Sequence, residues 1–548
     1  MSDGVRLSAT LTIPIPKQTD EKFPVLLEYK PYRKDDNFYN YNQPNIYYLV
    51  RRGFIVAKVD IRGTGSSEGI LIEHEYTSQE LDDCERVIEQ LAAHSQSNGR
   101  VGMYGLSWSA FNSLMMATLR RPPALRAILA AHGSEDLYKN DIHFMDGILH
   151  QDEYILSVDH ENALPTTPDY VMDEQWIKER FTRRPWIDVY LEHQLDSPFW
   201  RKHSIKYAYD NLTVPAYLLA GLDFAINIYE NARKSSSKIK VVIGPFVHAM
   251  PEYSYRNPGP GYDGKAEMVS ATAHLAHWIV RLEDIDIDSQ VWLVTGAALN
   301  GAQRETPPAY LEPNHLYKIR LQLHFTTWTF LPGHRIRVAI SNAMFPAFWP
   351  SPFSMNTSLY LNPLATFIDL PIIPSLPSAP PSPPPLFTQQ QIPVDDIVPD
   401  LFSGGEVLAA RNYDTNFDRT VINEQISYDL LPNGRFMSAL LAQNFSCSRL
   451  NPADVRWTAV ARHVYVFDIH GYTSIDDVPM KNDEEIAVYP DVDLSTRRHF
   501  ELTTELTCYS DQDYFYVNLK RQLFNRMGTK NEVPLTFVFS GKHKRQFQ

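Results

Sequence analysis

Two hydrophobic periods divide this chain. Up to about residue 245, short runs that are apolar at nearly every position alternate with stretches of helical periodicity. Continuous apolar runs bounded by Pro or Gly are typical of strands buried on both faces of a sheet. The predicted strands are 24–30, 54–61, 100–105, 125–131, 215–221 and 239–245, and the predicted helices include 45–52, 77–94 and the segment after residue 107. This alternation predicts an α/β fold with a mostly parallel sheet covered on both faces.

Residues 136–210 interrupt the alternation between two of the predicted strands. They are rich in Trp, Tyr, His and charged residues, and they favour helices without any strand pattern. We interpret them as a helical cap over a site. The α/β unit is therefore predicted to have a first part, 1–135, and a second part, 211–285.

After about residue 282 the hydrophobic period becomes two. Apolar positions alternate with polar ones in 318–325, in 336–340 and in 515–519, a pattern that predicts half-buried antiparallel strands. Residues 286–548 are therefore expected to form a β-sandwich or jelly roll. Within them, the Pro-rich segment 371–385 cannot donate the hydrogen bonds of a β-ladder, so we interpret it as an extended linker or loop, with an SH3-type ligand as the alternative.

Composition narrows the classes of partner and location. The 548 residues carry a net charge of −14, which argues against binding to nucleic acid or to anionic membranes. There is no secretory signal pattern and no apolar run near the roughly 20 residues that cross a bilayer. Three widely spaced cysteines, Cys84, Cys447 and Cys508, fit a reducing compartment. A cytoplasmic protein is the expectation, and a homodimer is left open.

The strongest chemical signal is the stretch Val101-Gly-Met-Tyr-Gly-Leu-Ser-Trp-Ser-Ala110. A strand, a sharp turn and then a helix is the layout that projects a serine hydroxyl above a parallel sheet as a nucleophile. The pattern around Ser107 is Gly-x-Ser-x-Ser, with Ser109 in place of the usual second Gly. The alternative is an ordinary helix start, where the Ser107 hydroxyl caps free backbone N–H groups.

The order of residues along the chain supplies partners for Ser107. In α/β-hydrolases the catalytic acid and then the histidine follow the serine, each on a loop after a strand. Asp223 and His248 each come soon after a predicted strand. A histidine takes the proton of the serine hydroxyl, and a carboxylate fixes the tautomer of that histidine. The alternative gives Asp223 a capping role and leaves His248 as a loop residue.

Two other groups of residues favour structural interpretations. The glycines after Asp60-Ile-Arg-Gly63 do not have the spacing of a dinucleotide-binding loop, so a turn is expected. His143, Asp146, His150 and Asp152 lack the His pair and Glu base of a zinc hydrolase, so polar contacts within the cap are expected. We expect no metal and no cofactor.

The motifs together resemble the family of cocaine esterase and the X-prolyl dipeptidyl aminopeptidases. They are Asp3-Gly-Val-Arg-Leu7, Pro31-Tyr32-Arg, the stretch from Gly53 to Gly69, Gly102-Met-Tyr-Gly-Leu-Ser-Trp108, Gly244-Pro-Phe-Val-His248 and Phe330-Leu-Pro-Gly-His-Arg-Ile-Arg337. The resemblance implies an α/β-hydrolase domain with a cap and a C-terminal jelly roll of the galactose-binding type. It also implies an oxyanion hole made of the Tyr32 hydroxyl and the backbone N–H of Trp108.

The chain departs from this family pattern at three places. Gly221-Leu-Asp223 is one residue shorter than the Gly-Trp-x-Asp of the family, and Phe246-Val-His248 replaces Trp-x-His. The segment 285–299 leads almost directly into late jelly-roll sequence, so the jelly roll is expected to be shortened. A sheet without central strands would expose edges and apolar surface.

These observations predict a serine hydrolase that cleaves an ester or amide through an acyl-enzyme, with a carboxylesterase as the first choice. X-Pro dipeptidyl peptidase and β-lactam acylase activities are alternatives, and an inactive relative that acts as a binding protein is an alternative of another class. An aminopeptidase also needs an acidic site for the substrate ammonium, for which Asp146, Asp152 and Glu153 are candidates.

Overall fold

The computed structural model describes most of the 548 residues. The described ranges are 1–40, 43–151, 154–220, 224–243, 248, 269–324, 328–361, 368, 370, 403–415, 418–483, 487–491, 493–527 and 534–548. No helix in these ranges is long and apolar enough to span a membrane. The Pro-rich segment 371–385, Asp152, Glu153 and Asp223 lie outside the described residues.

The N-terminal part is built on one sheet of seven strands, six of which the apolar runs predict; β1 was not predicted. Its strand order is β1-β3-β2-β4-β5-β8-β9, and every neighbouring pair is parallel except β1 with β3. The strands are β1 (Ala9–Thr12), β2 (Phe23–Lys30), β3 (Ile55–Asp60), β4 (Ser97–Leu106), β5 (Leu125–Ala131), β8 (Ala216–Ala220) and β9 (Ile239–Ile243). The predicted α/β class is confirmed.

Helices connect the parallel strands. Three of them, α1 (Gln43–Arg51), α2 (Ser78–Ala93) and α3 (Trp108–Met115), form where the sequence predicts them, and α8 (Phe224–Ala232) was not predicted. The longest, α2, begins at Thr77, whose hydroxyl accepts a hydrogen bond from the Glu80 N–H. One face of α2 buries Leu81, Val87 and Ile88, so its amphipathic pattern packs it against the sheet.

The glycine-rich segment after β3 is a structural turn, as expected. The Asp60 carboxylate accepts hydrogen bonds from the backbone N–H groups of Lys34 (2.9 Å) and Ser66 (3.0 Å). Gly65 has φ +46°, and a Cβ there would lie 2.2 Å from a carboxylate oxygen of Asp60. The glycine therefore lets the turn close on Asp60.

The cap contains the helices α4 (Tyr154–Ala163), α5 (Glu174–Trp176), α6 (Trp186–Glu192) and α7 (Pro198–Arg201). It also contains a hairpin of β6 (Phe144–Met145) with β7 (Ile148–Leu149). The expectation of helices alone was wrong at this point. Each strand has two residues, too few to produce an alternating pattern, and Gly147 (φ +79°) closes the turn between them.

The all-β region begins earlier than the sequence boundary at residue 285. Strand β11 (His277–Ile285) pairs with β12 (Val291–Asn300) and β13 (Arg335–Ser341) instead of joining the α/β sheet. A second small pair joins β10 (Val269–Ala271) and β14 (Thr357–Leu359). Residues from Val269 onward therefore belong to the β region.

One predicted strand in this region is not formed. Residues 318–324 form no named strand, although Ile319, Leu321 and Leu323 are buried. The segment is held by isolated bonds, such as His324 N–H to the Gly296 carbonyl (3.1 Å). Alternating burial without a continuous ladder produces the same sequence pattern as a strand.

The strand β13 is formed as predicted, but two of its apolar side chains are not half-buried. Ile336 is 49% exposed and Val338 is 40% exposed. Among the described residues, strand β13 lies at the edge of a three-stranded sheet and has β11 as its one partner. This exposed apolar surface is consistent with the shortened jelly roll that the sequence predicts.

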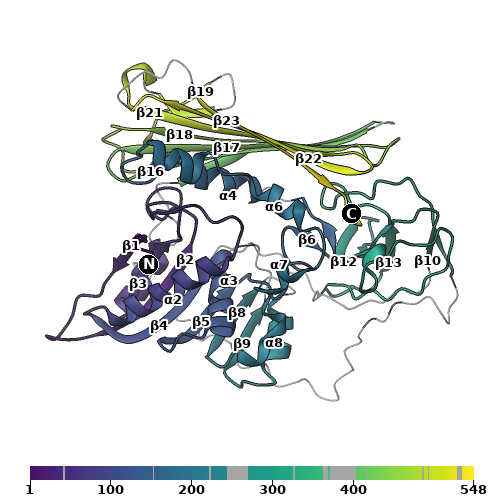
Figure 1. The fold of residues 1–548 in the computed structure, drawn as a ribbon, viewed down its shortest axis with the longest axis horizontal. Helices are drawn as coiled ribbons and strands as arrows, with labels where there is room; N and C mark the ends of the chain where they lie inside the picture. Colours follow the sequence, from purple (N-terminus) through teal and green to yellow (C-terminus); the bar gives the residue numbers. More distant parts are fainter. Residues whose placement is uncertain are drawn as a thin grey trace.

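The C-terminal part is a long antiparallel sheet in the order β15-β16-β17-β18-β21-β22-β23. Its strands are β15 (Ser403–Asp414), β16 (Asp418–Leu431), β17 (Arg435–Ser448), β18 (Val455–Val466), β21 (His499–Ser510), β22 (Tyr514–Asn525) and β23 (Leu535–Lys544), with a hairpin of β19 (Met480–Asp483) and β20 (Ala487–Pro490) beside it. Figure 1 shows this sheet lying across the molecule, with α4 and α6 between it and the α/β unit. One hydrophobic core runs from the parallel sheet to Trp457 and Phe515 of the long sheet. The all-β class is confirmed, and a jelly-roll arrangement stays a prediction.

Candidate active site

Ser107 stands at the turn between β4 and α3 in a strained backbone conformation. Its φ is 57° and its ψ is −120°, and its side chain makes no capping hydrogen bond to the helix. The Ser107 N–H donates to the Ala131 carbonyl (2.9 Å), and the Ser107 carbonyl accepts from the Ala110 N–H (2.7 Å). The turn is thus fixed by backbone bonds, and the capping alternative for the hydroxyl does not apply.

Small residues on either side of Ser107 allow the strand and helix to approach closely. Gly105 has φ +153°, and a Cβ there would lie 2.3 Å from Cβ of Ser109. Ser109 is buried, and its hydroxyl donates to the Tyr29 carbonyl (3.1 Å). Serine at the fifth motif position therefore packs inward and ties the helix to the neighbouring strand β2.

Tyr32 meets Ser107 from the end of β2. The Tyr32 hydroxyl is hydrogen-bonded at 2.8 Å to the Tyr154 hydroxyl of α4, and it lies beside the Ser107 side chain. Burial raises the pKa of Tyr32, and the Tyr154 and Ser107 hydroxyls oppose that rise. At neutral pH Tyr32 therefore keeps its proton, so its hydroxyl can donate a hydrogen bond.

Trp108, the residue after Ser107, is fully buried and positioned by a carboxylate. Its indole Nε1–H donates to Glu80 of α2 at 2.6 Å, and the Asn112 side-chain amide donates to the same oxygen at 2.8 Å. Burial raises the pKa of Glu80 to about 7, although both hydrogen bonds act to lower it. These contacts fix the ring of Trp108 at the base of α3, beside Tyr32.

The other two predicted triad residues are described to different extents. The His248 side chain is exposed, and its ring lies 5.3 Å from the ring of His132, centroid to centroid. His132 directly follows Ala131, whose carbonyl binds the Ser107 N–H. His248 therefore lies near the strand end beside Ser107. Asp223 falls outside the described residues.

A second group of polar residues gathers near this site, and the sequence did not reveal it. Glu75, Asp141 and His143 place ligand atoms within 4.8 Å of one another, and Nε2 of His143 contacts Glu75. They line a cavity of about 10 Å³, room for one water-sized group. A cation could be held there. Because Glu75 and His143 are far apart in the chain, no local sequence motif predicts this cluster.

The predicted cap contacts of the remaining polar residues are present. Asp146 accepts from the Ala298 N–H (2.8 Å) and pairs with His324 (3.0 Å). Nδ1 of His150 donates to the Ile142 carbonyl (2.9 Å). These residues connect the cap with the small β region and with itself, as expected of structural polar groups.

Two family models match the sequence. Residues 3–250 match the X-Pro dipeptidyl-peptidase (S15 family), and residues 268–369 match the X-Pro dipeptidyl-peptidase C-terminal non-catalytic domain. Cocaine esterase from Rhodococcus sp. (strain MB1 Bresler) is 26% identical over 283 residues, which cover 45% of this chain and 48% of that protein. The chain thus spans about half the length of the curated relative that it matches.

Solved structures share the fold. An aminopeptidase from a marine sediment archaeon, Thaumarchaeota archaeon, has a TM-score of 0.54 at 15% identity, covering 68% of this chain and 95% of that one. An α-amino acid ester hydrolase has a TM-score of 0.52 at 16% identity, covering 68% and 95%. A CocE/NonD family hydrolase from Staphylococcus aureus has a TM-score of 0.51 at 16% identity, covering 68% and 92%.

The predicted resemblance is therefore confirmed on sequence and on fold. The two models describe two domains of X-Pro dipeptidyl-peptidases. The one named as the C-terminal domain matches after the S15 domain in this chain. The elbow at Ser107 and the site around it lie within the first match. The chain belongs to the family of cocaine esterase and the X-Pro dipeptidyl-peptidases.

Proposed function

We propose that this protein is a serine hydrolase that cleaves a carboxylic ester through an acyl-enzyme. The observation that carries the proposal is the Ser107 turn, in which the hydroxyl leaves the helix N-terminus uncapped and lies beside the Tyr32 hydroxyl. A strained strand–turn–helix that presents a serine in this way is the nucleophile elbow of α/β-hydrolases. The family supplies the same expectation.

The proposed mechanism uses the residues in separate roles. His248 removes the proton of Ser107 as its oxygen attacks the carbonyl carbon, and Asp223 orients His248 and stabilises its charged form. The Tyr32 hydroxyl and the Trp108 N–H donate to the oxyanion of the tetrahedral intermediate. Protonated His248 then returns the proton to the leaving group, and water attacks the acyl-enzyme in the second half-reaction.

Hydrolysis of p-nitrophenyl acetate tests this proposal. Ser107→Ala should abolish turnover above the rate of buffer alone while the far-ultraviolet circular dichroism spectrum stays unchanged. Ser109→Ala is the matched control, because the Ser109 hydroxyl bonds the Tyr29 carbonyl and points away from the reaction. Turnover that persists in Ser107→Ala would refute the nucleophile assignment.

A second candidate substrate class is an aminoacyl ester or a peptide with a free α-ammonium. The buried carboxylates of Glu75 and Asp141 around an ammonium-sized cavity favour it. They join Asp152 and Glu153, which lie outside the described residues, as candidates for the acidic site, whereas Asp146 is engaged by Ala298 and His324. β-Lactam acylase activity, in which the side-chain amide of a β-lactam is cleaved, needs the same hydrolytic residues and stays an alternative activity.

Comparing two p-nitroanilides separates these substrate classes. An X-Pro-p-nitroanilide with a free ammonium should be cleaved faster than its N-acetyl derivative if this class is correct, and Glu75→Gln should remove the difference. Equal rates for the two anilides would restrict the protein to simple esters. An inactive relative would cleave neither anilide nor the ester.

A further inference from the structure

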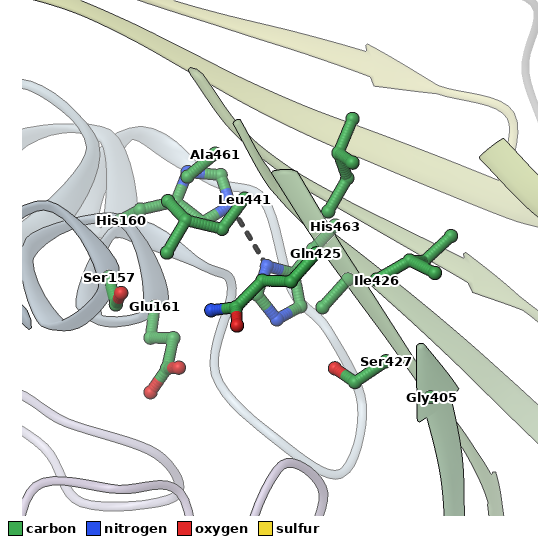
Figure 2. A pocket seen from close by; sticks show the side chains of 12 residues that line it. Ser157, His160, Glu161, Gly405, Gln425, Ile426, Ser427, Leu441, Ala461 and His463 are labelled. Carbon is green, nitrogen blue, oxygen red and sulfur yellow. Dashed lines mark hydrogen bonds between the residues drawn. The ribbon is translucent and has the colours of Figure 1, made fainter. Parts of the chain in front are cut away.

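A cavity of about 480 Å³ lies between the cap helix α4 and the long C-terminal sheet. Figure 2 shows side chains from α4 on one side and from the sheet strands on the other. The cavity is within the range of small-molecule sites in proteins, about 300 to 1,000 Å³. Neither family model extends to this sheet, because the second match ends at residue 369.

Small side chains on one face of the sheet create this space. In the strand register, Gly405 pairs with Ser427, Ser427 with Ala439, and Ala439 with His463. Because side chains alternate between the faces of a strand, this row points to one face, together with the next row, Gln425, Leu441 and Ala461. Gly, Ser and Ala in these rows leave the volume that larger side chains would fill.

The helix contributes the opposite wall. Ser157, His160 and Glu161 have the i, i+3 and i+4 spacing of one helical face. Tyr154, the residue whose hydroxyl binds Tyr32, precedes Ser157 by one turn of α4. The cavity therefore begins about one helical turn, roughly 5 Å along the axis, from the residue that contacts the proposed oxyanion hole.

A chain of hydrogen bonds ends in the cavity. Nδ1 of His160 bonds the Thr504 hydroxyl (2.7 Å), and Nε2 of His160 bonds Nδ1 of His463 (3.0 Å). The His463 side chain is buried, and its Nε2 has no hydrogen-bond partner. A buried polar atom without a partner costs about 1–3 kcal/mol. A ligand that bonds Nε2 would remove this cost.

The protonation states of the His160 and His463 imidazoles determine which polar group of a ligand can bond Nε2 of His463. Burial lowers the pKa of His160 well below its usual value. Burial also lowers the pKa of His463 to about 4; the Asp36 carboxylate favours the charged form of His463, and the Arg33 guanidinium opposes it. Both rings are therefore neutral near pH 7. Depending on the tautomer, Nε2 of His463 donates or accepts, and a hydroxyl or a carbonyl oxygen matches it without a change of charge.

We propose that this cavity binds a group with an apolar body and one uncharged oxygen, with that oxygen hydrogen-bonded to Nε2 of His463. Ala439, Leu441 and Ala461 provide the apolar surface for the body. The group is either the distal end of a substrate held at Ser107 or a separate small molecule of the same chemistry. Only the case in which the group is the end of a substrate rests on the proposed function. Binding of the group in the cavity does not depend on it.

Calorimetric titration of the full chain with three matched probes tests the proposal. The probes are 4-phenylbutan-1-ol, 4-phenylbutanoate and 4-phenylbutylammonium, which differ only in the charge of the polar end. The alcohol should bind, and the two ions should bind at least tenfold more weakly. Equal binding of either ion would overturn the assignment, as would absence of binding by the alcohol.

Two variants locate the binding. His463→Phe keeps the ring but removes Nε2, and should weaken alcohol binding about three- to tenfold, the worth of one neutral hydrogen bond. Ala439→Leu fills the cavity beside the His463 ring while both imidazoles are kept, and should abolish binding. Ala442→Leu on the other face of β17 and His470→Phe on an exposed loop are the controls. Wild-type affinity in Ala439→Leu would overturn the proposal.

Competition distinguishes the two sources. If the cavity holds the end of a substrate, the alcohol should raise the KM of p-nitrophenyl 4-phenylbutanoate and leave p-nitrophenyl acetate unaffected. If it holds a separate molecule, neither KM should change while binding persists. Failure of the proposed hydrolytic function would abolish both ester reactions and leave the calorimetric result intact.

Discussion

At the scale of single residues, strain and polarity concentrate around Ser107. A non-glycine residue in this backbone conformation costs of the order of 1–3 kcal/mol, and here the bonds to Ala131 and Ala110 hold it in place. The Ser107 hydroxyl lies beside Tyr32 and does not cap the helix. This is the arrangement in which a serine is available for attack.

Tyr32→Phe should lower kcat for p-nitrophenyl acetate about 10²- to 10³-fold, because it removes one donor to the oxyanion. The change keeps the ring and its contacts with Trp108 and Phe38. Tyr154→Phe is the matched variant, since that hydroxyl bonds the Tyr32 hydroxyl, and its effect should be several times smaller. Equal losses in steady-state kinetics would contradict an oxyanion role for Tyr32.

Glu80 should make the protein less stable as the pH rises. Its folded-state pKa of about 7 is above the ordinary glutamate pKa of 4.5, which applies in the unfolded chain, so the folded protein binds an extra proton between these two pH values. The contribution is fully present below about pH 4.5 and is lost as the pH rises through 7, by up to about 3 kcal/mol.

Glu80→Gln keeps an oxygen that accepts from Trp108 and Asn112 but cannot ionise. Urea denaturation from pH 5 to pH 8 should therefore show a smaller fall in the free energy of unfolding for this variant than for the wild type. Glu89→Gln, on the exposed face of the same helix, is the control. Parallel pH profiles for wild type and Glu80→Gln would show that Glu80 does not carry the effect.

At the scale of elements, the fit of β4 against α3 depends on Gly105. Adding a methyl group there should destabilise the protein by about 1–3 kcal/mol, because Cβ would meet Ser109 at 2.3 Å in a packed core. Gly99→Ala is a matched control in the same strand, since Gly99 also has a positive φ but has no atom within 4 Å of its Cβ position. Urea denaturation midpoints that fall equally in both variants would contradict a contact at Ser109.

Elements of the α/β unit could be predicted from sequence because local pattern decides them. Strands β2, β3, β4, β5, β8 and β9 contain short apolar runs, and α2 combines an N-cap with an apolar stripe. The alternation in 318–324 misled, because an extended segment with alternate buried side chains has the same sequence pattern as a paired strand. The hairpin β6–β7 was missed because two residues cannot show a period.

The site was predicted only where its residues adjoin a motif. Ser107 and Trp108 lie in the elbow, and Tyr32 came from the family resemblance. Glu75, Glu80 and Tyr154 were missed because the segment 75–80 and the helix α4 meet the Ser107 turn only in the folded chain. The assignment of Asp223 stays a prediction, since it lies outside the described residues.

At the scale of the whole molecule, the long C-terminal sheet is tied to the cap by buried charge. The Arg521 guanidinium of β22 pairs with Asp159 of α4 and donates to the carbonyls of Phe181 (3.1 Å) and Arg183 (2.7 Å). Both charged side chains are almost fully buried. The sheet thus holds the cap that carries Tyr154 over the proposed active site.

Arg521→Met should lower the free energy of unfolding by about 3–5 kcal/mol, because it leaves the Asp159 carboxylate buried without its cation. Arg462→Met, which breaks the partly exposed pair with Glu501 (2.9 Å) on the same sheet, should cost about 0–1 kcal/mol. Urea denaturation measures both changes. A small effect at Arg521 would mean that the sheet and cap are joined mainly by apolar contacts.

Labelling with a fluorophosphonate probe tests the central claim most directly, because the probe reacts with a serine only when its hydroxyl is activated. We predict that folded wild-type protein is labelled, that mass spectrometry of the peptides places the adduct on Ser107, and that Ser107→Ala is not labelled while Ser109→Ala is. Folded protein that carries no adduct on Ser107 would contradict the account and favour a binding protein without hydrolytic activity.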